Sequence, residues 1–175
     1  MGREVRMVPP NWAHQERDPE KNQYRHKGLQ PMYDERFDDR FAEWLADFDR
    51  VRAGNLNEIE RECYTSDFPL AEWLLDEGTP LDPTYYRPWH DEEATWFQVW
   101  ETVSEGTPVT PPFATQAELV DYLVANGDEW DRKRGHGGWP RAAAEQFVGR
   151  GWSPSMVVEK TETGTKIFEP RDGTP

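Results

Sequence analysis

Residues 95–104, TWFQVWETVS, are rich in aromatic and β-branched side chains, a composition that favours a β-strand. Side chains alternate between the two faces of a strand. One face would carry Phe97, Val99 and Val103, and the other would carry Trp96, Gln98 and Trp100. Because both faces are partly apolar, the pattern predicts a strand at the centre of a sheet.

Helices are predicted both before and after this strand in the sequence. Residues 34–52, DERFDDRFAEWLADFDRVR, repeat apolar side chains at spacings of three and four, with Asp34 as the N-cap. The run TQAE from Thr115 to Glu118 is a capping box for a helix that ends at Gly127. The remaining predicted elements are a strand at 3–8, helices at 68–77 and 140–150, and a hairpin at 156–169.

Together these elements predict an α+β fold with about four helices and a small, mostly antiparallel sheet that includes the C-terminal hairpin. We expect a strand and an extended N-terminal arm at 1–31, a single domain at 32–169 and a tail at 170–175. A chain of 175 residues is long enough to bury a core without a metal or a disulfide. Nine Trp, six Tyr and eight Phe can supply much of that core.

Charge is concentrated in the middle of the chain. The net charge is −14, and residues 32–105, with twenty acidic residues and six arginines, account for a balance of the same size. A negative field repels nucleic acid and anionic membranes, and it attracts basic protein surfaces. We therefore expect no direct binding to nucleic acid and no membrane association.

The first candidate site is the acidic, aromatic-rich region. A solvated helix face would explain its charges, but so would a mimic of nucleic-acid phosphate or a dock for a basic host protein. Tryptophans often anchor protein interfaces, although they are more often core residues. The residues expected to bind a partner are Asp38, Asp39, Glu43, Asp47, Trp89 and Trp100.

The second candidate site is residues 132–141, RKRGHGGWPR, where cations and glycines precede a helix. Such a loop could hold an anion at the helix N-terminus, with a tryptophan stacked on a base. A spacer whose cations balance nearby acids is the alternative explanation, and the Walker and dinucleotide-binding patterns are absent. The residues expected to bind a nucleotide are Lys133, Arg134, His136, Gly137, Gly138, Trp139 and Arg141.

Catalytic and metal sites have little support in the sequence. The four histidines are far apart, and no H-x-x-x-H or C-x-x-C pattern occurs, so we expect neither a metal nor a cofactor. Cys63 lies near Glu60 and Glu62, whose charges disfavour a thiolate, and no G-x-S-x-G pattern is present. The sequence shows no signal peptide and no stretch of ~20 apolar residues, so we expect a cytoplasmic protein.

Three stretches, MGREVRMVPPNW, WETVSEGTPVTPPFATQAELVDYLV and GWSPSMV, resemble small proteins encoded by tailed phages and prophages. The resemblance implies an accessory protein of the bacterial host cytoplasm, of a kind that often disables host machinery or captures host signalling molecules. The leading hypothesis is a non-enzymatic protein that counters a host defence factor by occupying a basic surface. The alternatives are a protein that captures a nucleotide signal as a homo-oligomer, and a small nucleotide hydrolase.

Overall fold

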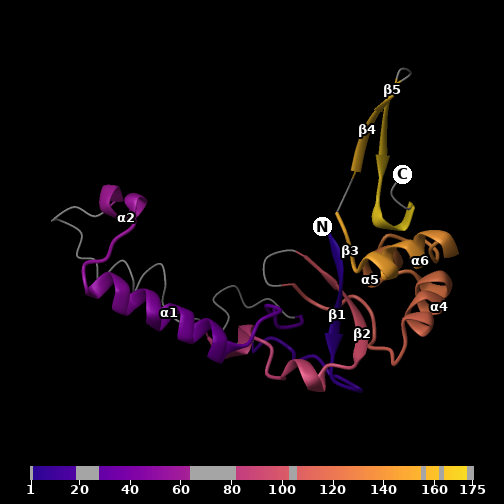
Figure 1. Cartoon of the computed structure of the whole chain (residues 1–175). Helices are drawn as coiled ribbons and strands as arrows, with labels where there is room; N and C mark the ends of the chain where they lie inside the picture. The colour runs from indigo at the N-terminus through magenta and orange to yellow at the C-terminus, as the bar shows by residue number, and fades with distance from the viewer. Residues whose placement is uncertain are drawn as a thin grey trace. The chain divides into compact units, whose positions relative to one another are not determined.

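The computed structural model describes residues 2–18, 28–63, 82–102, 106–154, 157–161 and 164–172. Contacts divide the chain into two compact units. We call residues 1–34 together with 89–175 the sheet unit, and residues 35–88 the helical unit. Each is described by itself below. Together, their elements confirm the predicted α+β class (Figure 1).

The sheet unit is built on a three-stranded antiparallel sheet with the order β2-β1-β3. Its strands are β1 (Arg3–Val8), β2 (Trp96–Glu101) and β3 (Trp152–Ser153). The strand predicted at 3–8 is therefore confirmed, but it takes the central position that we expected for 95–104. The other edge of β2 is covered by a proline-rich segment, because Phe97 and Phe113 exchange backbone hydrogen bonds of 2.8 and 2.9 Å.

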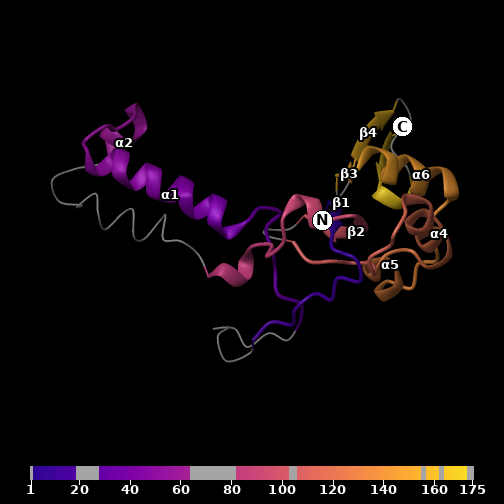
Figure 2. The same ribbon diagram turned by 60° about the horizontal axis from the view of Figure 1, so that its bottom comes forward.

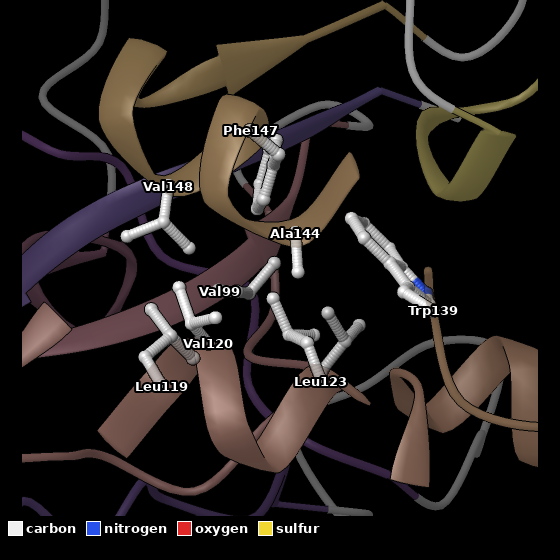
Figure 3. Packing of buried hydrophobic residues seen from close by; sticks show 9 residues of the cluster. Val99, Leu119, Val120, Leu123, Trp139, Ala144, Phe147 and Val148 are labelled. Atoms are coloured by element: carbon white, nitrogen blue, oxygen red, sulfur yellow. The ribbon is translucent and has the colours of Figure 1, made fainter. Parts of the chain in front are cut away.

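Both faces of β2 are packed, as the alternation predicted. Val99 lies in one core cluster with residues of the helices that follow it (Figure 3). Trp100, the next residue, lies in a second cluster with Val8 and Trp89. Val99 and Trp100 are both fully buried, so neighbouring residues of one strand serve opposite cores.

Three helices, α4 (Gln116–Asn126), α5 (Glu129–Lys133) and α6 (Arg141–Arg150), lie together in the sheet unit (Figure 2). The predicted capping box is present: the Glu118 backbone N–H donates to the Thr115 hydroxyl at 3.2 Å, and the Thr115 backbone N–H donates to the Glu118 carboxylate at 3.0 Å. Gly151 ends α6 with a left-handed φ of 76°, a conformation that glycine adopts without steric cost.

The C-terminal hairpin is confirmed. It pairs β4 (Val157–Thr161) with β5 (Gly164–Phe168) in antiparallel fashion. The sequence predicted that the hairpin would belong to the main sheet. Instead, the two strands form a separate two-stranded sheet. After it, η3 (Pro170–Asp172) packs against α6, so part of the predicted tail is structured.

The N-terminal arm packs on its own chain. The Gln30 backbone N–H donates to the Gln15 carbonyl at 2.9 Å, which joins the two described parts of the arm. The Trp12 ring lies 4.5 Å from the Trp89 ring, between centroids. The arm thus contributes an aromatic side chain beside the second core cluster.

The helical unit contains α1 (Phe37–Arg52), α2 (Glu58–Cys63) and the short helix η1 (Pro83–Tyr85). The long helix is confirmed, but Arg36 occupies the N-cap position that we expected for Asp34, and its side chain makes no capping hydrogen bond. Glu60 accepts from the Arg50 guanidinium at 2.6 and 2.8 Å, which ties α2 to α1. The helix predicted at 68–77 lies outside the described residues. In the sheet unit, η2 (Asp91–Glu93) precedes β2.

Candidate functional site

The four acidic residues expected to bind a partner all lie on α1 and face solvent. The side chains of Asp38, Asp39, Glu43 and Asp47 are 77, 66, 68 and 62% exposed. Asp39, Glu43 and Asp47 follow one another at intervals of four residues, so they form one row along the helix, which we call the acidic ridge. Val51 is the one buried residue among the sixteen of α1, all of which are described.

Arginines of the same unit lie beside these acids. Arg40 contacts Glu43 at 3.3 Å, and Arg50 contacts Asp47 at 3.2 Å. Arg36 lies 3.0 Å from Asp38 and 3.9 Å from Asp39. Exposed ion pairs of this kind contribute only about 0–1 kcal/mol each. The arginines therefore compensate the ridge locally and add little to the stability of the helix.

The charge of the helical unit exceeds what these pairs neutralise. Residues 35–88 contain fourteen acidic residues and six arginines, which leaves a net charge of −8. Asp49 lies exposed on α1, and no ion pair joins it to any other described residue. The unit consequently carries a negative field that reaches beyond its surface.

The apolar side of α1 is only partly covered. Phe37, Phe41, Trp44 and Phe48 stack in series with ring centroids 5.4–5.9 Å apart. Phe41 remains 37% exposed and Leu45 44% exposed. Periodicity places both on the apolar side of the helix, but it shows only which residues share a side and not what covers that side.

Trp89 and Trp100, the two tryptophans of the predicted partner site, belong to the sheet unit, whereas the four acids belong to the helical unit. Trp89 is 4% exposed and Trp100 is fully buried, both within the second core cluster of the sheet unit. The Arg6 guanidinium covers the Trp100 ring at 4.5 Å from its centroid. Neither ring is available to a partner at the surface.

Three of the four cations in residues 132–141 have an acidic neighbour, and the fourth, Arg132, donates to the Tyr122 hydroxyl at 2.9 Å. Lys133 contacts Glu129 at 2.6 Å, Arg134 contacts Glu169 at 3.2 Å, and Arg141 contacts Asp121 at 2.7 Å. His136 is exposed, with its Nδ1 atom 3.7 Å from Asp131. This arrangement agrees with a spacer whose cations balance nearby acids.

Trp139 and Gly138 serve packing in this loop. The Trp139 indole N–H donates to the Asp131 carboxylate at 2.5 Å, and its ring, 3% exposed, lies against Phe147 (Figure 3). A Cβ atom at Gly138 would fall far inside contact distance of the Val124 carbonyl, whereas Gly137 has open space around it. The Trp139 ring therefore has no face free to stack on a base. Nucleotide binding by this loop stays a prediction.

A buried polar network supports the sheet unit and was not expected from the sequence. The Asp128 side chain is 1% exposed and accepts from the Arg3 guanidinium at 2.5 Å. Asp128 also accepts from the Asp131 backbone N–H at 2.9 Å, and the Asp131 carboxylate accepts from the Trp139 indole. The partners are 125 residues apart in sequence, so no local pattern could indicate the ion pair. The network fixes β1 against the segment around α5.

His14 connects the N-terminal arm to the second core cluster. Its Nε2 atom lies 2.5 Å from the Gln30 carbonyl, and its Nδ1 atom accepts from the Trp12 indole N–H at 3.4 Å. Its ring meets Trp100 edge-on at 4.9 Å. Burial lowers the pKa of His14, and the nearby Arg6 charge lowers it further, against the raising effect of the Gln30 hydrogen bond. Above pH 6.5 the imidazole is therefore neutral, and because Nδ1 accepts from the Trp12 indole, its proton lies on Nε2.

The described residues give little support for a metal site, a membrane-spanning helix or a small-ligand pocket. No three His, Cys, Asp or Glu side chains there converge as metal ligands. None of the helices described there has both the length and the apolar character needed to cross a bilayer. A cleft of about 250 Å³ at the start of α1 is lined by Arg36, Phe37, Asp38, Pro83, Tyr86, Arg87 and Pro88. It is smaller than the ~300–1,000 Å³ typical of small-ligand pockets.

No protein-family model, curated protein or solved structure matches the chain. The function is therefore inferred from the chain's own residues.

Proposed function

We propose that the protein is a phage-encoded, non-enzymatic binding protein that counters a host defence factor by occupying a basic surface with the acidic ridge of α1. The observation that carries this proposal is the exposure of the acidic side chains on a helix with one buried residue. A helix that served mainly to build a core would bury its apolar side more completely.

The charges support docking to a cationic surface. The field of a unit with a net charge of −8 speeds encounter with basic proteins and repels acidic ones. On contact, lysines or arginines of the partner would replace Arg40 and Arg50 beside the ridge. Because the existing pairs are exposed and weak, their loss costs little compared with the new pairs. Such binding weakens as salt concentration rises.

The sequence resemblance to phage accessory proteins supports a host protein as the partner. A phage protein acts inside the infected bacterium, where host defence proteins that bind nucleic acid carry basic surfaces. A carboxylate-bearing helix that covers such a surface would block it without any chemistry. This explains why the proposal needs neither a cofactor nor a catalytic residue.

Two matched positions test the proposal. Glu43 on α1 and Glu145 on α6 are both exposed glutamates that lie beside an arginine, at 3.3 and 3.8 Å. A photo-crosslinking amino acid at position 43 should capture one discrete host protein in infected bacteria, and the same amino acid at position 145 should not. The captured protein, once purified, provides the partner for affinity measurements.

The purified pair then gives a quantitative test. Glu43→Lys should weaken binding at least about tenfold, because it places like charges in contact, and Glu145→Lys should change it less than about threefold. Raising salt from about 50 to about 500 mM should weaken wild-type binding more than the Glu43→Lys variant. Equal effects of the two substitutions, or no captured protein at position 43, would contradict the proposal.

A further inference from the structure

The apolar side of α1 carries a second row of residues, distinct from the acidic ridge. Asp38, Phe41, Leu45, Phe48 and Arg52 follow one another at intervals of three, four, three and four, which places them along one side of the helix. We call this row the apolar strip. Its middle residue, Leu45, lies two positions from Glu43 and therefore points about 200° away from the middle of the ridge.

The middle of the strip is exposed to solvent. Leu45 is 44% exposed and Phe41 is 37% exposed, while Phe48 is partly buried. Exposed apolar side chains in a row on one helix mark a surface that gains free energy when another surface covers it.

Opposite charges stand at the two ends of the strip. Asp38 is 77% exposed at its start, and Arg52 is exposed at its end. Asp38 has an exposed pair with Arg36, whereas no ion pair joins Arg52 to any described residue. The strip thus has an acid at one end, a base at the other and apolar residues between them. A second strip that runs in the opposite direction would place its base beside this acid and its acid beside this base.

We propose that a second copy of this chain packs antiparallel on the apolar strip, about a twofold axis near Leu45. In this arrangement Asp38 of each copy lies beside Arg52 of the other, and Phe41 of each lies beside Phe48 of the other. A parallel arrangement would bring like charges together at both ends. Charge complementarity thus selects both the occupant and its direction.

The expected dimer is weak. Sixteen residues of helix are about 24 Å long, and one pair of such helices buries less area than the ~1,200 Å² or more of stable interfaces. We expect dissociation at about 10–1,000 µM. The inference rests on the strip and does not depend on the proposed function. Because the ridge points away from the strip, a dimer would carry two ridges.

Charge exchange tests the pairing. Sedimentation equilibrium from about 5 to about 500 µM should show a monomer and a dimer in exchange. Asp38→Lys and Arg52→Glu should each weaken the dimer at least about fivefold, because each brings like charges together at both ends. The double variant exchanges the charges and should return the dissociation constant to within about threefold of wild type.

A neighbouring position provides the control. Asp39→Lys makes the same charge change one residue away, beside the same Arg36, but on the ridge. It should alter dimer dissociation less than about threefold. Leu45→Glu should abolish the dimer while circular dichroism shows unchanged helix content, which excludes unfolding as the cause.

Three results would overturn the inference. They are a monomer at every concentration, equal effects of Asp38→Lys and Asp39→Lys, and a double variant no better than either single variant. A monomer at every concentration would show that no second copy binds the strip. Either of the other two results would show that the dimer does not form through antiparallel pairing of the strip.

Discussion

The two units use similar side chains in opposite ways. In the sheet unit, Val99 and Trp100 are neighbours on one strand and both are fully buried, each in its own core cluster. In the helical unit, a row of aromatic and aliphatic residues on α1 leaves Leu45 44% exposed. An apolar sequence pattern therefore does not show whether its residues are buried in a core or exposed. That depends on whether other segments of the chain cover them.

Charges differ between the units in the same way. The sheet unit buries the Arg3–Asp128 ion pair, with side chains 8 and 1% exposed. The helical unit keeps the Arg40–Glu43 pair at 47 and 68% exposure. A buried pair is strongly destabilising to break, whereas an exposed pair is easily exchanged. The Arg3–Asp128 pair is thus part of the scaffold of the sheet unit, whereas the Arg40–Glu43 pair contributes little to the stability of the helical unit.

The largest effect is expected for a core tryptophan. Trp100→Ala should destabilise the sheet unit by about 3–5 kcal/mol, because it removes a fully buried ring between β1 and the arm. Trp152→Ala is the control, since Trp152 is 55% exposed, and it should cost less than about 1 kcal/mol. Chemical denaturation followed by circular dichroism measures both. Similar costs would mean that the second core cluster does not support the sheet.

Two adjacent glycines give the next comparison. Gly138→Ala should destabilise by about 1–3 kcal/mol, because a Cβ there meets the Val124 carbonyl. Gly137→Ala adds the same atom in open space and should change stability by less than about 1 kcal/mol. If thermal unfolding shows both variants equally stable, the loop does not pack on α4 as described.

A smaller, pH-dependent effect is expected at His14. Its folded pKa lies below the ordinary value of 6.5, so the unfolded chain binds more protons between the two values. The contribution to stability is complete above pH 6.5 and is lost as pH falls toward the folded pKa. Protonation puts a second donor against the Trp12 indole N–H and beside Arg6, which disfavours the packed arm.

The His14 effect is measured by tryptophan fluorescence and stability as pH falls from about 7.5 to about 5. Wild type should show a transition that His14→Gln lacks, and His136→Gln, which changes an exposed ring, should retain it. A transition that survives in His14→Gln would assign it to another group.

The smallest effect is expected on the acidic ridge. Asp39→Asn, Glu43→Gln and Asp47→Asn should each change the free energy of unfolding by less than about 0.5 kcal/mol, because their ion pairs are exposed. Denaturant titration of each variant measures this. A loss above about 1 kcal/mol would make the ridge part of the scaffold and remove the contrast between the units.

Local signals in the sequence predicted much of the fold. Alternation in 95–104 predicted the two packed faces of β2, and the Thr115–Glu118 pattern predicted the start of α4. The central position of β1 could not be predicted, because strand order depends on pairing between segments far apart in the chain. The sequence also did not predict Arg36 as the N-cap, because aspartate, present at position 34, is a more favourable N-cap residue than arginine.

The sequence predicted the surroundings of the candidate site residues only in part. The exposure of the four acids follows from the recurrence of charges on an amphipathic helix. The tendency of tryptophans to be core residues fits the burial of Trp89, but the partners of the Trp89 and Trp139 rings, Trp12 and Asp131, are set by tertiary packing and could not be predicted. The exposure of Phe41 and Leu45 could not be predicted either, because the helical pattern does not show whether another segment covers the apolar side.

The most direct test of the central claim is a map of which acidic residues meet a cationic molecule first. Amide chemical shifts of the labelled protein would be followed by NMR during titration with a lysine-rich amphipathic peptide. The account predicts that the largest shifts fall on residues 38–49 of α1, and that exposed acids of the sheet unit such as Asp121 and Glu145 shift little. Shifts spread evenly over the acids of both units would contradict it.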